Sequence, residues 1–224
     1  MNEFDYIKKY FKPLTNEVGR SLEDDAAVFS SNKSIDYVLS TDTLVEKIHF
    51  LGDENPETIA KKALRVNLSD LAAMGAEPLY YNLSLCIPPK KVKNFIPSFT
   101  RGLKSDQKQY HIYLIGGDLT SSLKYITITI TIIGKVSKGK AVSRKGALDG
   151  DYLYVTGVLG LSKIGLDYLK SNKKDFNIAK KKYFFPEPRV NFAFKLSNYV
   201  NSMIDISDGL LQDASHLSKA SGLG

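Results

Sequence analysis

The segment Tyr125–Ile133 constrains the fold most, because isoleucines occupy its even positions from 126 to 132 and threonines its odd positions from 127 to 131. Successive side chains of a β-strand point to opposite faces, so this pattern puts the isoleucines on one face and the threonines on the other. A strand with one apolar and one hydroxyl face is typical of an antiparallel sheet that covers a core on one side. The sequence therefore predicts a half-buried sheet.

Other patterns predict strands and helices on both sides of this segment. Asn55 and Pro56 supply an N-cap and a first-turn proline for a helix that runs to Met74 and stops at Gly75. Further helices are expected over residues 1–10, 92–103, 161–169, 189–200 and 210–220, and further strands over 26–29, 37–41, 80–87, 112–115, 152–155 and 203–206. Helices and strands mixed in this way indicate an α+β fold.

A stretch rich in glycine, lysine and serine over residues 134–150 separates two halves of the chain. We place the boundary inside it, which gives an N-terminal domain of residues 1–137 and a C-terminal α+β domain of residues 138–224. The sequence stops directly after the last expected helix, so we expect the C-terminal domain to be truncated.

Composition excludes several classes of protein. With 224 residues, 43% of them hydrophobic, the chain can bury a substantial core. No apolar run approaches the roughly 20 residues of a membrane span, and the N-terminus lacks a signal-peptide core, so we expect a cytoplasmic protein without a membrane partner. Much of the formal charge of +7 comes from lysines between residues 170 and 182, where a solvated loop is expected. No nucleic-acid-binding motif accompanies the basic residues, so we expect no nucleic-acid partner.

Five short segments carry an aspartate among small, apolar or hydroxyl residues: Asp24-Asp25, Ser40–Asp42, Asp70, Gly116–Asp118 and Asp205–Asp208. Such positions are expected at the ends of elements that converge on a cleft. Two carboxylates about 4 Å apart repel by roughly 4 kcal/mol at an effective dielectric constant of 20, so a cluster of them needs cations. Hard divalent ions with oxygen ligands are the natural compensation.

Three of these motifs also have plain structural interpretations. Ser-Thr-Asp at 40–42 is common in turns and caps. Asp70 could pair with Arg65 or Lys62 along its helix, although an aspartate among leucines otherwise costs several kcal/mol. The two glycines before Asp118 permit close approach to a ligand, but a tight turn explains them equally well.

Two further candidates could bind phosphate. Asp205–Gly209 follows an expected strand and opens an expected helix, which suits phosphate, but Ser207 or Asp208 could equally serve as an N-cap. Arg144 could hold a phosphate with its planar guanidinium or be a solvated linker residue. The sequence contains neither a P-loop nor a Gly-x-Gly-x-x-Gly fingerprint, and its three histidines lack metal-ligand spacing.

Four strings, taken in order, closely resemble the thiamine-monophosphate kinase family: Ser-Thr-Asp-Thr-Leu-Val-Glu at 40–46, Val-Asn-Leu-Ser-Asp-Leu-Ala-Ala-Met-Gly-Ala-Glu-Pro at 66–78, Leu-Ile-Gly-Gly-Asp at 114–118 and Ile-Asp-Ile-Ser-Asp-Gly-Leu at 204–210. The resemblance covers essentially the whole chain. It implies the two-domain fold of the aminoimidazole-ribonucleotide synthetase superfamily, whose members bind ATP with several magnesium ions. It also implies a homodimer formed through the β-sheet or barrel of the N-terminal domain.

The same resemblance implies the roles of individual residues. Magnesium ions would be bound by Asp25, Ser40, Thr41, Asp42, Asp70, Asp118, Asp205 and Asp208. ATP would contact Tyr110, Gly117, Asp118, Arg144 and Ser207, and thiamine monophosphate would contact His49. The implied reaction moves the γ-phosphoryl group of ATP to thiamine monophosphate and gives thiamine diphosphate and ADP, with no catalytic residue beyond the metal cluster.

Two departures from the family pattern keep alternatives open. Ser21–Asp25 stands where the family usually has Gly-Ile-Gly-Asp-Asp, and the family's Gly-Gly-Glu-Asp-Tyr-type segment, which helps to bind the thiamine moiety, is missing. The alternatives are a non-catalytic nucleotide-binding or dimerisation remnant and another ATP-using member of the superfamily.

Overall fold

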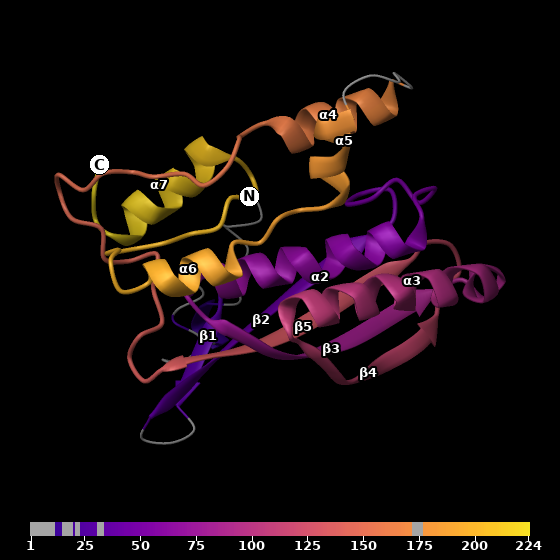
Figure 1. Ribbon diagram of the computed structural model, residues 1–224, viewed down its shortest axis with the longest axis horizontal. Coiled ribbons are helices and arrows are strands. Elements are labelled where there is room, and N and C mark those ends of the chain that lie inside the picture. The colour runs from indigo at the N-terminus through magenta and orange to yellow at the C-terminus, as the bar shows by residue number, and fades with distance from the viewer. Residues whose placement is uncertain (1–11, 15–19, 21–22, 31–33, 172–176) are drawn as a thin grey trace.

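A computed structural model describes residues 12–14, 20, 23–30, 34–171 and 177–224, so the helix expected over residues 1–10 lies outside the described residues. A five-stranded sheet forms the base of the fold, and helices α2 and α3 lie over one of its faces (Figure 1). The C-terminal helices lie on the side of α2 that faces away from the sheet. The α+β fold predicted from the sequence is confirmed.

The sheet has β5 at its centre and runs in the order β1-β2-β5-β3-β4. Its strands are β1 (Ala27–Ser30), β2 (Ile35–Val45), β3 (Glu77–Ile87), β4 (Tyr113–Ser121) and β5 (Thr127–Ser137). Strand β5 pairs antiparallel with both β2 and β3, whereas β4 pairs parallel with β3 at the edge. Ile128, Ile130 and Ile132 are fully buried, so the half-buried antiparallel strand predicted from the alternation is confirmed.

Helix α2 (Pro56–Ala73) is the central helix, and α3 (Pro89–Tyr110) packs beside it. Helix α2 starts as predicted, because the side chain of Asn55 accepts a hydrogen bond from the backbone N–H of Glu57 at 3.0 Å. Leu64, Leu68 and Leu71 of α2 are fully buried. The helix is therefore held on two sides, and its polar residues are fixed relative to both the sheet and the C-terminal half.

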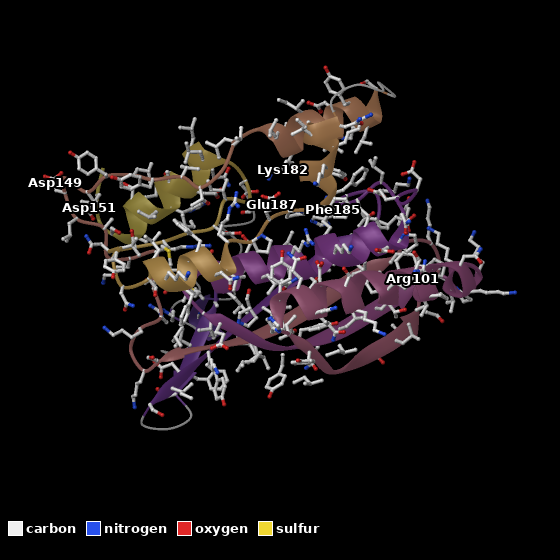
Figure 2. The ribbon with its side chains drawn as sticks, in the orientation of Figure 1. Arg101, Asp149, Asp151, Lys182, Phe185 and Glu187 are labelled. Atoms are coloured by element: carbon white, nitrogen blue, oxygen red, sulfur yellow. The ribbon has the colours of Figure 1, made fainter. Side chains whose placement is uncertain are left out.

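Four helices follow in the C-terminal half: α4 (Leu161–Lys170), α5 (Asn177–Phe184), α6 (Val190–Leu196) and α7 (Leu210–Ala220). Arg65 of α2 joins them to the sheet domain. Its Nε lies 2.6 Å from a carboxylate oxygen of the buried Asp106 in α3, and its Nη1 donates to the carbonyl of Pro186 at 3.3 Å. Figure 2 shows Phe185 and Glu187 in the segment that runs from α5 back along α2.

Several predicted elements differ from the structure. The strands expected over residues 152–155 and 203–206 are wrong, because both segments lack a paired neighbouring strand within the described chain. Tyr152 and Tyr154 are 85% and 83% exposed. Part of the expected loop over residues 170–182 is helix α5, and the helix expected over residues 189–200 ends at Leu196.

The domain boundary at residue 137 stays a prediction. Among the described helices, none has the length and apolar character needed to cross a membrane.

Candidate functional site

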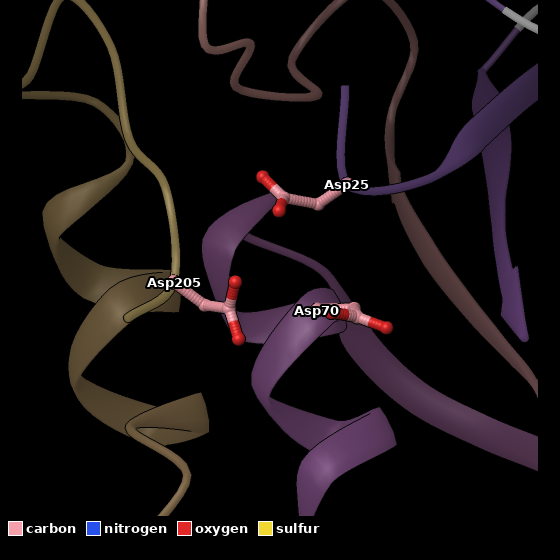
Figure 3. A group of neighbouring side chains, drawn as sticks. All are labelled: Asp25, Asp70 and Asp205. Carbon is pink, nitrogen blue, oxygen red and sulfur yellow. The ribbon is translucent and has the colours of Figure 1, made fainter. Parts of the chain in front are cut away.

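The carboxylates of Asp25, Asp70 and Asp205 form a cluster in which one oxygen from each lies within 4.8 Å of the others. They come from three separate segments (Figure 3). Asp25 precedes β1, Asp70 lies in the last turn of α2, and Asp205 lies between α6 and α7. The cluster forms because α2 is packed between the sheet and the C-terminal helices. We call these three residues the carboxylate cluster.

The environment of the carboxylate cluster disfavours negative charge. Burial, followed by the charges of Asp42 and Asp205, raises the pKa of Asp70 to about 9. Burial and the neighbouring Asp25 raise the pKa of Asp205 to about 7. Burial also raises the pKa of Asp25, although its contact with Arg144 opposes this. With pKa values of about 9 and about 7, Asp70 and Asp205 retain protons near neutral pH, so they can accept a divalent ion in exchange for protons.

Strand β2 sends Ser40 and Asp42 to one face of the sheet and Thr41 to the other. Ser40 donates a hydrogen bond to Asp70 at 2.6 Å, and the backbone N–H of Asp42 donates to the side chain of Asn67 at 3.1 Å. The hydroxyl of Thr41 instead donates to Thr131 at 2.9 Å, on the face of the sheet opposite the described helices α2 and α3. The structure therefore brings Ser40 and Asp42 to the carboxylate cluster but keeps the Thr41 hydroxyl away from it.

Arg144 is the cation that contacts the cluster within the described chain. Its Nε lies 3.2 Å from one oxygen of Asp25, and its Nη2 donates to the other. Its backbone N–H and the hydroxyl of Ser143 both donate to Asp24 at 2.8 Å. Arg144 is thus fixed at the site and is not a solvated linker residue. The role of Asp24, which holds the backbone of this segment, was not predicted from the sequence.

The turn before α7 is held by a residue that the sequence analysis missed. The buried carboxylate of Asp213 accepts hydrogen bonds from the backbone N–H groups of Ser207 at 3.0 Å and Gly209 at 3.1 Å. No side chain caps α7 at its N-cap residue Gly209, so the alternative in which Ser207 or Asp208 is the N-cap is wrong. Asp208 is exposed and accepts a hydrogen bond from Gln212 at 2.9 Å. Asp213 lies four residues after the N-cap Gly209, and this spacing is the feature of the sequence that could have indicated its role.

The structure keeps Asp118, Gly117 and Tyr110 apart from the carboxylate cluster. Asp118 is exposed on edge strand β4, separated from β2 by β3 and β5. Gly117 lies inside β4 and not in a turn. A Cβ there would come 1.8 Å from the carbonyl oxygen of Leu83, so glycine permits the close approach of β4 to β3. Tyr110 ends α3, where the guanidinium carbon of Arg65 lies 5.7 Å from its ring centroid.

His49 lies in the turn after β2, and its orientation is fixed by the backbone. Its Nδ1 accepts a hydrogen bond from the backbone N–H of Val45 at 2.9 Å. The exposed ring is close enough to Asp42 to lower the pKa of that carboxyl, although burial of Asp42 has the larger, opposite effect. His49 therefore stands at the flank of the carboxylate cluster.

The donor set at the cluster suits a hard divalent cation. All its candidate ligand atoms are oxygens of Asp25, Asp70, Asp205, Asp42 and Ser40. Magnesium and calcium prefer oxygen ligands, whereas structural zinc sites use cysteine and histidine. A bound cation fits this site because the buried carboxyl groups of Asp70 and Asp205 otherwise retain protons.

Comparisons with known proteins identify related chains. Residues 23–136 match the family described as AIR synthase related protein, N-terminal domain. A thiamine-monophosphate kinase of Haemophilus influenzae is 39% identical over 97% of this chain, and one of Caulobacter vibrioides is 38% identical over 98%. The solved structure "AaThiL complexed with AMPPCP and TMP" matches 98% of this chain with a TM-score of 0.91 and 32% identity. The chain spans 67%, 63% and 70% of these three proteins.

Proposed function

Because the chain belongs to the thiamine-monophosphate kinase family, we propose that it transfers the γ-phosphoryl group of ATP to thiamine monophosphate and forms thiamine diphosphate and ADP. The carboxylate cluster carries this proposal, because phosphoryl transfer between two polyanions needs concentrated positive charge that buried carboxylates can hold. A related structure that contains AMPPCP and TMP supports the choice of substrates. A reaction that consumes ATP also fits the cytoplasmic location expected from the sequence.

We propose that Asp25, Asp70 and Asp205 hold magnesium, with Ser40 and Asp42 as neighbouring ligands. When bound, magnesium supplies positive charge that screens the phosphates of ATP and the acceptor. Thr41 can contribute its backbone carbonyl but not its bonded hydroxyl. Asp118 and Asp208 are exposed and lie outside the carboxylate cluster, so we leave them out of this primary site.

The residues of the chain would act by positioning charge. Arg144 presents a planar guanidinium that suits bidentate contact with a phosphate of ATP. Since the Nδ1 of His49 accepts a hydrogen bond, its neutral ring carries the proton on Nε2 and can donate to the phosphate of thiamine monophosphate. Gly117, Tyr110 and Ser207 stay proposed ATP contacts on the strength of the family resemblance alone. No covalent enzyme intermediate is required.

We also propose a homodimer formed through β4 and the face of the sheet that none of the described helices covers. Tyr113, Ile115 and Leu119 of β4 are 60%, 55% and 61% exposed, and β4 is an edge strand. Exposed apolar edge strands are prone to pair with another chain. Light scattering after size-exclusion chromatography would test this, with Ile115→Lys expected to give monomers. A wild-type protein that is monomeric at micromolar concentration would contradict the proposal.

The principal test measures thiamine diphosphate formed from ATP and thiamine monophosphate, with and without magnesium, on the 224-residue chain. Magnesium-dependent product formation supports the proposed function. A second candidate function is nucleotide binding without catalysis, which the related structure that contains AMPPCP supports. Magnesium-dependent ATP binding by calorimetry without any product would support that candidate and contradict the first.

A further inference from the structure

Lys62 of α2 occupies an unusual place for a lysine. Its Nζ donates a hydrogen bond to the backbone carbonyl of His49 at 2.7 Å. The same Nζ lies 3.7 Å from the ring centroid of Tyr183, a buried residue of α5. Burial lowers the pKa of Lys62 to about 8, against the opposing charge of Glu54. The half-buried side chain therefore links three elements: α2, the turn that carries His49, and α5.

The His49 turn, residues 46–50, is held at several backbone positions. The backbone N–H of His49 donates to the carbonyl of Val45 at 2.9 Å, and that of Lys47 donates to the carbonyl of Phe50 at 2.7 Å. Lys47 adopts a positive φ of 70°, which a residue with a side chain rarely adopts. The turn is thus a defined structure, and the contact from Lys62 fixes it to α2.

The segment after the turn is fixed in a similar way. The two carboxylate oxygens of Glu54 accept hydrogen bonds from the backbone N–H groups of Leu51 at 2.7 Å and Gly52 at 2.6 Å. Burial, followed by the charges of Glu54 and Asp53, raises the pKa of Tyr183 to about 12. The phenol of Tyr183 therefore stays neutral at physiological pH. Its ring covers Lys62 from the side of the C-terminal half.

We infer that Lys62 is a positioning residue for His49, holding the His49 turn at a fixed place relative to the carboxylate cluster. This inference rests on the proposed function, in which His49 contacts the phosphate of thiamine monophosphate. Lys62 and Asp70 share one helix and are eight residues apart, about 12 Å along its axis. A rigid helix therefore sets the spacing between the acceptor-binding imidazole and the cation-binding end of α2. The cation–π contact with Tyr183 makes this spacing depend on α5 as well.

The kinetic test compares Lys62→Met with Lys61→Met. Lys61 is the adjacent lysine, whose ammonium lies 3.3 Å from the carboxylate of Glu57 on the same helix. Loss of a charge-assisted hydrogen bond that positions His49 should raise KM for thiamine monophosphate about tenfold and leave KM for ATP within about twofold. Lys61→Met should change neither value. Equal increases of both KM values in Lys62→Met would indicate a general structural role and overturn the inference.

A double mutant separates positioning from direct contact with the substrate. If Lys62 acts through His49, Lys62→Met should have little further effect in a His49→Ala background. An undiminished tenfold effect in that background would mean that Lys62 acts independently of His49, which overturns the inference. If Lys62→Met does not fold, Lys62→Arg, which keeps the charge but moves the donor, should still raise KM for thiamine monophosphate alone.

A spectroscopic readout is independent of turnover. Long-range 15N–1H spectra of the imidazole of His49, assigned with His49→Ala, should show an unprotonated Nδ1 in the wild type and averaged tautomers in Lys62→Met. An unchanged tautomer in Lys62→Met would overturn the inference. Absence of product from the wild type, with the tautomer still dependent on Lys62, would instead count against the proposed function alone.

Discussion

The guanidinium of Arg144 contacts both carboxylate oxygens of Asp25, and the side chain of Asp25 is only 1% exposed. Asp25 is at the same time one of the three acids of the carboxylate cluster. One buried carboxylate is therefore shared between a fixed protein cation and the place where a divalent ion fits. Removal of Arg144 and addition of a metal should consequently have linked effects on the free energy of unfolding.

We expect Arg144→Met to lower the free energy of unfolding of the metal-free protein by about 2 kcal/mol, because it leaves the Asp25 carboxylate buried without its partner. Magnesium should restore part of this loss. Urea unfolding with and without magnesium measures both effects. Arg101→Met is the control, since the Arg101 side chain is 65% exposed and its Nε lies 3.9 Å from Glu57 (Figure 2). A destabilisation of the same size in both variants would contradict the prediction.

Asp70→Asn should leave the metal-free protein as stable as the wild type or more stable. A carboxyl with a pKa of about 9 is protonated at neutral pH, and asparagine resembles that protonated form. Magnesium should then no longer raise the melting temperature. Thermal unfolding with and without magnesium chloride measures this, and Asp149→Asn, a change at an exposed acid, should keep the full magnesium effect. A persistent magnesium effect in Asp70→Asn would remove Asp70 from the proposed site.

Gly117→Ala should destabilise the protein by at least about 2 kcal/mol or prevent its folding. The added Cβ would lie 1.8 Å from the carbonyl oxygen of Leu83, and the residue has a φ of 149°. Gly116→Ala is a matched neighbour, because its Cβ would meet only the side-chain oxygen of Asn82 at 3.1 Å. Melting temperatures of the two variants test the difference. Similar values would show that β4 does not need this close approach to β3.

Lys62 should give the stability a specific pH dependence. Its pKa falls from an ordinary value of 10.5 to about 8 in the folded protein, so between these values the unfolded chain binds more protons than the folded one. The contribution of Lys62 to the free energy of unfolding should therefore rise between pH about 8 and about 10.5, by at most about 1.4 kcal/mol per pH unit. Urea unfolding of wild type and Lys62→Met at pH 7.5, 9 and 10 measures it. A constant difference between the two proteins over this range would contradict the assigned burial.

Local patterns in the sequence determined the regular elements of the sheet domain. The isoleucines at 126–132 specify which face of β5 is buried, and Asn55 with Pro56 specifies the start of α2. These features depend on neighbours within a few residues, so periodicity and capping chemistry suffice to predict them. The ordered motifs likewise indicated the family, because their identity and order do not require a structure.

Only the tertiary structure decided which of the predicted site residues meet. Asp25, Asp70 and Asp205 are far apart in sequence and are brought together by the packing of α2 between two layers, whereas Asp118 stays on the edge strand. The alternation of side chains along β2 is local and puts Ser40 and Thr41 on opposite faces of the sheet. The packing of the helices decides that Ser40, and not Thr41, meets the carboxylate cluster. Within the described part of the chain, residues 152–155 have no strand partner, because β-pairing requires a second segment, which no local pattern can supply. Lys62 and Asp213 escaped prediction for the same reason, since their roles arise from contacts with His49 and with the backbone before α7.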